Sequence, residues 1–185
     1  MRFLCWLFGC CYSNAIGGGW CDRCQCMPSN RTLAHQEHKM STYTAYTDGA
    51  CRLSNPGLCC CGFVVYRGSE FFHERTHILP GLNTNNVSEF CGLIDLLEWA
   101  KLAHCTEITI YCDSKLVVES SQARWGICDK LRPYAAKAFQ LLTEGNHILL
   151  HTKGHAGNEG NEYIDCRLNE TLDKYQGIVR KRRAK

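Results

Sequence analysis

Four acidic residues have types and positions that suit metal-dependent chemistry: Asp48, Glu89, Asp113 and Asp165. Carboxylate oxygens are the hard ligands that Mg²⁺ and Mn²⁺ prefer. Clustered carboxylates repel one another, so a cluster is costly unless cations neutralise it. Two such ions about 4 Å apart can activate a water molecule and stabilise the leaving oxygen of a phosphate ester. The four acids therefore predict a site for phosphodiester hydrolysis.

Each acid taken alone also has a purely structural explanation. Asp48 begins a turn dipeptide, and Asp113 can cap the helix that follows it. Asn86 and Glu89 have the spacing of a capping box. Asp165 can lie on the solvent face of its helix. The catalytic interpretation is favoured because all four occur together, in the order of strands and helices described next.

The elements that must position these acids alternate along residues 42–173. In the first helix, which Asn86 is expected to cap, apolar residues recur at i, i+3, i+4 and i+7 from Phe90 to Leu97. The other expected helices are residues 114–122, 130–144 and 158–173, and the expected strands are residues 42–50, 58–66, 70–77, 107–112 and 147–152. The order βββαβααβα predicts an α/β fold with a five-stranded mixed sheet flanked by helices. Asp48 and Asp113 each end a strand, where α/β sheets bind ligands.

Five short motifs follow one another with compatible spacing along this part of the chain. They are Tyr46-Thr47-Asp48-Gly49-Ala50, Asn55-Pro56-Gly57, Thr84-Asn85-Asn86-x-x-Glu89, Ile110-Tyr111-Cys112-Asp113-Ser114, and Lys153-Gly154-His155-Ala156-Gly157-Asn158 with Asn161-Glu162-x-x-Asp165. Together these motifs resemble type 1 ribonuclease H over residues 43–173. The resemblance implies a ribonuclease H-like fold and an endonuclease that hydrolyses the RNA strand of RNA–DNA hybrids.

The resemblance also implies roles for the candidate catalytic residues. The four carboxylates would hold two Mg²⁺ or Mn²⁺ ions in a two-metal-ion mechanism that leaves 5′-phosphate and 3′-hydroxyl ends. His155, before the last helix, would assist proton transfer or product release, and histidine titrates in the right range for this. The alternative for His155 is an ordinary loop histidine.

Five further positions match hybrid-binding residues of the family. Asn55, Asn85 and Asn86 match positions that contact the hybrid, where recognition of the 2′-hydroxyl needs short polar groups. Thr84 matches a position that binds a phosphate of the DNA strand. Trp125 is similar in place to an aromatic that packs on the DNA strand, and its alternative is a core tryptophan.

The distribution of charge departs from the family pattern. Many members carry a basic helical protrusion that grips the hybrid, whereas residues 125–132 form only a short link. Residues 41–173 hold 11 basic and 16 acidic residues, and the tail at 174–185 holds six basic residues and no acid. We expect this basic tail to attract the nucleic acid, with an inert solvated end as the alternative.

The first 26 residues hold six of the 15 cysteines and predict a small zinc-ribbon-like module. Cys5, Cys10, Cys21 and Cys24 form two pairs that suit a tetrahedral structural zinc site. The alternative ligands are Cys11, Cys26, His35 and His38. A leader without metal is the other interpretation. Residues 27–41 are polar, lack apolar periodicity and predict a linker.

Localisation and partners are predicted from what the sequence lacks. Residues 1–8 imitate a signal peptide, but their apolar stretch is shorter than the roughly 7–15 residues of a signal core. No apolar run approaches the ~20 residues of a membrane-spanning helix. We expect a cytoplasmic monomer with reduced thiols that binds RNA–DNA hybrid and no membrane.

Three other functions compete with this interpretation. One is a different nuclease of the same fold, such as an exonuclease or a resolvase, although those families place their acids differently. Another is a catalytically silent hybrid-binding module or scaffold, which loss of a carboxylate would have favoured. A third possibility is that the cysteine-rich module directs the protein to a partner.

Overall fold

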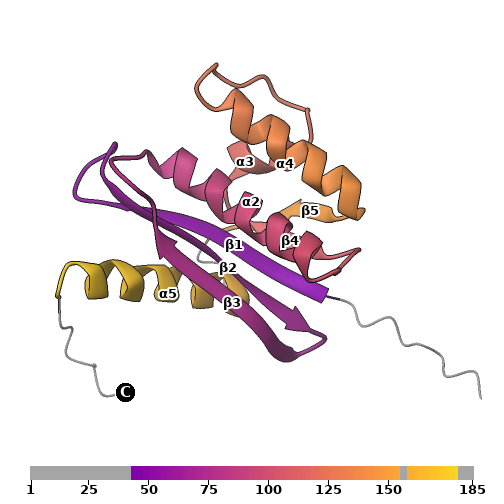
Figure 1. Ribbon diagram of the computed structural model, residues 1–185, viewed down its shortest axis with the longest axis horizontal. Helices are drawn as coiled ribbons and strands as arrows, with labels where there is room; N and C mark the ends of the chain where they lie inside the picture. The colour runs from indigo at the N-terminus through magenta and orange to yellow at the C-terminus, as the bar shows by residue number, and fades with distance from the viewer. Residues whose placement is uncertain (1–42, 155–157, 179–185) are drawn as a thin grey trace, which may run out of the picture. The chain divides into compact units, whose positions relative to one another are not determined.

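The computed structural model describes residues 43–154 and 158–178 (Figure 1). The expected zinc-ribbon-like module at 1–26 and the linker at 27–41 lie outside the described residues. The same holds for the tail beyond residue 178 and for His155.

The five predicted strands form one mixed sheet. Strands β1 (Tyr43–Arg52), β2 (Leu58–Arg67) and β3 (Glu70–Ile78) form an antiparallel meander. Strand β4 (Thr109–Cys112) pairs parallel to β1, and β5 (Ile148–His151) pairs parallel to β4. The order across the sheet is β3-β2-β1-β4-β5, so β1 is the central strand. The predicted α/β class, the mixed sheet and the order of elements are confirmed.

Four helices among the described residues flank the sheet. They are α2 (Asn85–Leu102), α3 (Lys115–Ser121), α4 (Arg132–Gly145) and α5 (Glu159–Tyr175). Helix α2 packs on β1 and β2 and carries α4 on its other side, whereas α5 packs on β1, β2 and β3. In Figure 1, α2 and α5 lie on opposite faces of the sheet.

Alternating side chains of the central strands supply a core for each face. On the α2 face, Phe63 and Val65 are fully buried with apolar residues of α2 such as Leu93. On the α5 face, Val64 packs with a row from α5 that includes Leu168. The sheet is therefore apolar on both sides, which accounts for the uninterrupted apolar run in β2.

A glycine lets α2 approach the sheet closely. A Cβ atom added at Gly92 would lie 2.7 Å from the carbonyl oxygen of Asp48 and 2.8 Å from Oγ1 of Thr47. Only a residue without a side chain fits at this crossing. The close approach fixes the distance of α2 from the middle of β1.

Two local predictions about helix starts are wrong. The N-cap of α2 is Thr84, whose Oγ1 accepts a hydrogen bond of 3.3 Å from the Val87 amide, and Asn86 lies inside the helix. Helix α4 begins at Arg132 rather than at residue 130, with Pro133 in its first turn. Proline is favoured there because its missing N–H would have no partner in a first turn.

Two further sequence expectations concern cysteines and membrane spans. Cys59, Cys60, Cys61, Cys105 and Cys112 are buried, as expected for thiols that serve as small core residues. None of the helices in the described ranges combines the length and apolar character that crossing a bilayer requires.

Candidate active site

The four predicted carboxylates converge where β4 ends beside the middle of β1. The expectation that Asp48 ends its strand is wrong, because β1 continues to Arg52 in its pairing with β2. Asp48 lies in β1, and Asp113 directly follows β4, the parallel neighbour of β1. Glu89 comes from the start of α2 and Asp165 from α5. The charges of Asp113, Asp165 and Glu89 all raise the pKa of Asp48. Helices on both faces of the sheet and two parallel strands thus supply one acidic cluster.

Asp48 is the buried centre of this cluster, with 8% of its surface exposed. Burial, followed by the charge of Asp113, raises its pKa to about 8. The Gly49 amide donates a hydrogen bond of 2.7 Å to Oδ1 of Asp48 and lowers the pKa only in part. Asp48 ionises fully near neutral pH only if a cation offsets these effects.

Glu89 is held from two sides. Asn85 Nδ2 donates a hydrogen bond of 2.8 Å to Oε1 of Glu89, and the side chain of Ser114 also bonds to Glu89. Burial, partly offset by these bonds, raises the pKa of Glu89. Its second oxygen, Oε2, is buried without a hydrogen-bond partner among the described residues. A bound cation would satisfy this orphaned acceptor. The expected capping box between Asn86 and Glu89 is wrong, because Thr84 caps the helix and Glu89 turns to Asn85.

Asp113 is positioned by residues that follow it far along the chain. Nδ2 of Asn161 in α5 lies 3.4 Å from Oδ2 of Asp113, and Asn161 is 3% exposed. A Cβ added at Gly154 would lie 3.1 Å from the same oxygen, so the segment before residue 155 passes beside the cluster. His155 itself lies outside the described residues, and its role stays a prediction.

Asn161 is a site residue that the sequence reasoning did not assign. It stands four residues before Asp165, so both lie on one side of α5. That spacing is the signal that would have found it. The side chain of Asp165 is held by a residue one turn further along α5, because Asn169 Nδ2 donates a hydrogen bond of 3.1 Å to Oδ1 of Asp165.

The expected hybrid-binding residues fall into two groups. Asn55 Oδ1 accepts a hydrogen bond of 3.1 Å from the Asn85 amide, which brings Asn55 to the start of α2 beside Thr84 and Asn86. Trp125 stands apart, on the loop between α3 and α4.

The alternative of a core tryptophan is wrong for Trp125. The side chain is 46% exposed, and Lys115 Nζ lies 5.3 Å from the centre of its ring. Among the described residues, the exposed face of the Trp125 ring is available to contact another molecule.

Comparison with known proteins identifies the family. The family described as RNase H matches residues 40–171. A ribonuclease H of Chromohalobacter salexigens is 32% identical over 170 residues, which covers 80% of this chain and 95% of the relative. A ribonuclease H of Thermosynechococcus vestitus is 33% identical over 146 residues, covering 72% of this chain and 90% of the relative.

Solved structures give the same result. RNase H1 from the halophilic archaeon Halobacterium salinarum has a TM-score of 0.64 at 32% identity, covering 72% of this chain and 98% of that one. LC11-RNase H1 in complex with an RNA/DNA hybrid has a TM-score of 0.64 at 28% identity, covering 73% and 99%. The resemblance stated from the motifs is confirmed: the chain belongs to the RNase H family, as a type 1 member and an enzyme of the ribonuclease H class.

Proposed function

We propose that this protein is an endoribonuclease that hydrolyses the RNA strand of RNA–DNA hybrids. The observation that carries the proposal is the convergence of Glu89, Asp113 and Asp165 around the buried Asp48. The similarity to LC11-RNase H1, whose structure holds an RNA/DNA hybrid, supports the choice of substrate. The competing scaffold function has no support from the site, because none of the four carboxylates is missing.

The same four carboxylates, Asp48, Glu89, Asp113 and Asp165, are proposed to hold two Mg²⁺ or Mn²⁺ ions. Their oxygens are hard donors, and the partnerless Oε2 of Glu89 and the raised pKa of Asp48 both fit bound cations. When bound, the ions supply Lewis-acid chemistry at the phosphate ester.

The protein's own groups orient the carboxylates. Asn85 fixes Glu89, Asn161 fixes Asp113, and the Gly49 amide fixes Asp48. These bonds hold the acids in place before the substrate arrives, so little reorganisation remains for the reaction.

In the proposed reaction, water attacks phosphorus and the bond to the 3′ oxygen breaks. The products carry a 5′-phosphate and a 3′-hydroxyl. His155 is proposed to assist proton transfer to or from the reacting oxygens, or the release of product.

Selectivity for the hybrid is assigned to the start of α2. Asn55, Asn85 and Asn86 are short polar residues suited to the minor groove, where the 2′-hydroxyl distinguishes RNA from DNA. Thr84 is proposed to bind a phosphate of the DNA strand. Trp125 is proposed to pack on that strand with its exposed face.

We also propose that one structural Zn²⁺ is bound by Cys5, Cys10, Cys21 and Cys24, and that the basic tail contributes phosphate contacts. We further propose that the protein acts as a cytoplasmic monomer.

One assay tests the central proposal. Labelled RNA–DNA hybrid, duplex RNA and duplex DNA are each incubated with the protein and Mg²⁺, Mn²⁺ or a chelator. We expect cleavage of the RNA strand of the hybrid alone, dependent on the added metal. Equal cleavage of all three duplexes, or full activity in chelator, would contradict the proposal. Mapping the product ends tests the position of bond cleavage.

A further inference from the structure

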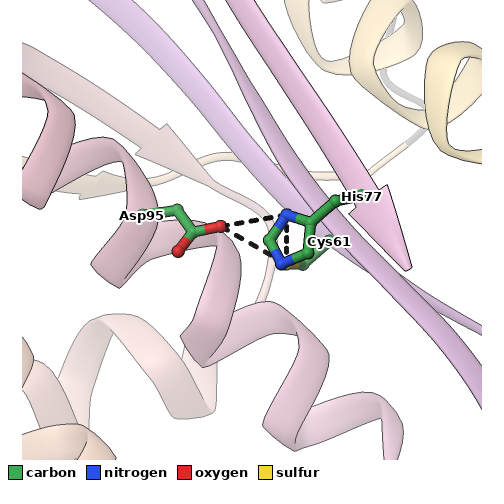
Figure 2. Close-up of side chains that lie close together, drawn as sticks. All are labelled: Cys61, His77 and Asp95. Atoms are coloured by element: carbon green, nitrogen blue, oxygen red, sulfur yellow. Dashed lines mark hydrogen bonds and ion pairs between the residues drawn. The ribbon is translucent and has the colours of Figure 1, made fainter. Parts of the chain in front are cut away.

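A second group of metal-ligand side chains lies on the α2 face of the sheet, outside the carboxylate site. Cys61 in β2 and His77 in β3 are direct cross-strand partners, and Asp95 projects from α2 above them (Figure 2). One ligand atom from each residue lies within 4.8 Å of the others. The three residues come from separate parts of the sequence, so only the fold brings them together.

The distances within this group match those of a metal site. Cys61 Sγ lies 3.7 Å from Asp95 Oδ2 and 3.9 Å from His77 Nδ1, and His77 Nδ1 lies 3.3 Å from Asp95 Oδ2. Zinc bonds of about 2.3 Å to sulfur and about 2.0–2.2 Å to nitrogen and oxygen place tetrahedral donor atoms about 3.3–3.7 Å apart. The size of the observed triangle differs from this by only a few tenths of an ångström. Cys61 Sγ also lies 3.7 Å from Nε2 of His77, so the imidazole ring has to turn for Nδ1 to face the ion.

The burial of the three side chains suits a bound cation. The Cys61 side chain is fully buried, and the side chains of Asp95 and His77 are 20% and 36% exposed. The group thus has a closed floor and an open side, where water can supply a fourth ligand. Of the charges around Asp95, the positive charge of Arg75 acts more strongly than the negative charge of Glu98, so the metal has to bind against it.

We propose that Cys61, His77 and Asp95 bind one Zn²⁺ ion, separate from the ions of the carboxylate site. A thiolate, an imidazole and a carboxylate form a donor set typical of zinc rather than of Mg²⁺. The ion would tie the edge strand β3 and its neighbour β2 to α2, the helix that also carries Glu89. The proposal does not depend on the proposed nuclease function.

Ligation requires the Cys61 thiol to lose its proton to solvent as the metal binds. Burial raises the pKa of this thiol well above its usual range, which opposes ligation and is part of the cost of metal binding. A bound zinc ion deprotonates a coordinating thiol outright, so binding releases one proton.

The test uses Co²⁺ as a spectroscopic probe of the full-length chain. The six cysteines of residues 1–26 are replaced by serine so that they bind no metal. Saturating Mg²⁺ occupies the carboxylate site, where cobalt held by oxygen alone gives no thiolate charge-transfer band. We expect one equivalent of Co²⁺ to produce a thiolate-to-cobalt band together with the intense visible absorption of tetrahedral cobalt, and added Zn²⁺ to displace both.

Three variants locate the site, and one serves as a matched control. Cys61→Ser should abolish the thiolate band, and Asp95→Asn and His77→Gln should weaken Co²⁺ affinity by more than about 100-fold, the upper end for an outer-shell partner. Asp95 and His77 are partly exposed, so these two variants keep the fold. Cys105→Ser removes another buried thiol away from the group and should bind like the parent.

The result that would overturn the proposal is equally specific. If the parent protein shows no thiolate band at stoichiometric Co²⁺, the proposal is wrong and the group is only an ion pair beside a buried cysteine. Unchanged affinity in both Asp95→Asn and His77→Gln would also overturn the proposal. Thermal melts add a second readout, because Zn²⁺ should raise the Tm of the parent and of Cys105→Ser but not that of Asp95→Asn.

Discussion

The side-chain amide of Asn85 donates a hydrogen bond of 2.8 Å to Oε1 of Glu89, while the backbone amide of the same residue donates to Oδ1 of Asn55 at 3.1 Å. One residue thus connects a proposed hybrid contact to a proposed metal ligand. A shift of Asn85 would therefore change its contacts with Asn55 and with Glu89 together.

Asn85→Asp should damage catalysis through Glu89. The change replaces the donor at 2.8 Å by a second carboxylate, and the repulsion raises the pKa of Glu89 further. We expect kcat to fall by about 10- to 100-fold, the range for losing an outer-shell partner, and the acid limb of the pH–rate profile to move to higher pH. Asn86→Asp is the matched control, because it adds the same charge at the next, exposed residue. If the acid limb of the pH–rate profile moves equally in Asn85→Asp and Asn86→Asp, the hydrogen bond from Asn85 to Glu89 does not have the proposed role.

Asp48→Asn and Asp113→Asn should each abolish most cleavage. Each removes a proposed metal-binding charge with little change of shape, and metal ions contribute several kcal/mol to such reactions. We expect kcat in Mg²⁺ to fall by about 10³-fold or more with the fold retained. His155→Ala should lose only about 10²-fold, since it assists proton transfer rather than holding metal. Parent-like turnover in either aspartate variant would show that the metal site is assigned wrongly.

The stability of the metal-free protein should fall as the pH rises from 6 to 9. The pKa of Asp48 is about 8 in the folded protein, against an ordinary value of 3.8. Between these values the folded state binds more protons than the unfolded state, so raising the pH lowers the free energy of unfolding. The stabilisation is complete below about pH 4 and is lost as the pH passes through about 8.

The variant Asp48→Asn tests this linkage by thermal melts in chelator. It should remove most of the pH dependence and raise the Tm at pH 9 by about 4 °C or more, the shift that ~1 kcal/mol produces in a domain of this size. Asp129→Asn is the control, because the Asp129 side chain is 88% exposed. If both variants melt with the parent's pH dependence, Asp48 is not the group responsible. Saturating Mg²⁺ should also flatten the profile of the parent.

Gly49→Ala should destabilise the protein because its new Cβ would meet backbone atoms. That Cβ would lie 2.3 Å from the amide nitrogen of Glu89 and 2.4 Å from the carbonyl carbon of Ser88. We expect a loss of about 3 kcal/mol in urea unfolding, the upper end for overpacking. Gly126→Ala is the matched control, because nothing lies within 4 Å of its Cβ position. If Gly49→Ala and Gly126→Ala were equally stable, α2 would be able to shift and make room for the new Cβ at residue 49.

Deletion of residues 179–185 should weaken binding to the hybrid and flatten its salt dependence. The segment holds five Lys and Arg residues, and for every phosphate that one of them neutralises, the slope of log affinity against log salt is steeper by about 0.9. The maximal rate should change little. The deletion leaves the end of α5 intact, where the Ile178 amide bonds to the carbonyl of Asp173. Identical slopes and affinities would establish the tail as an inert end.

Much of this site was predictable from the sequence because its signals are local. Asp48 and Asp113 each accompany a strand that the sequence pattern reveals, and parallel pairing then places the end of β4 beside Asp48 in β1. The helical spacing from Phe90 to Leu97 likewise predicted α2 and, with it, the place of Glu89. These features depend on neighbouring residues alone.

The rest depends on contacts that the sequence does not display. Thr84, Asn85 and Asn86 are all good capping residues, so local preference cannot choose among them. In the fold, Asn55 reaches the Asn85 amide and Thr84 becomes the cap. The grouping of Cys61 with Asp95 was not predicted at all, because it follows from the strand register and from where α2 crosses the sheet.

The central position of β1 protects the backbone at Asp48 from local opening motions. This strand is hydrogen-bonded to β2 on one side and to β4 on the other, and α2 and α5 cover its two faces. Amide hydrogens in such a strand exchange with solvent only when the whole domain opens, whereas edge strands and helix ends open separately. Asp48 therefore sits on the part of the backbone that is the last to exchange. We therefore expect local opening at the ends of α2 and α5 to leave the backbone at Asp48 in place.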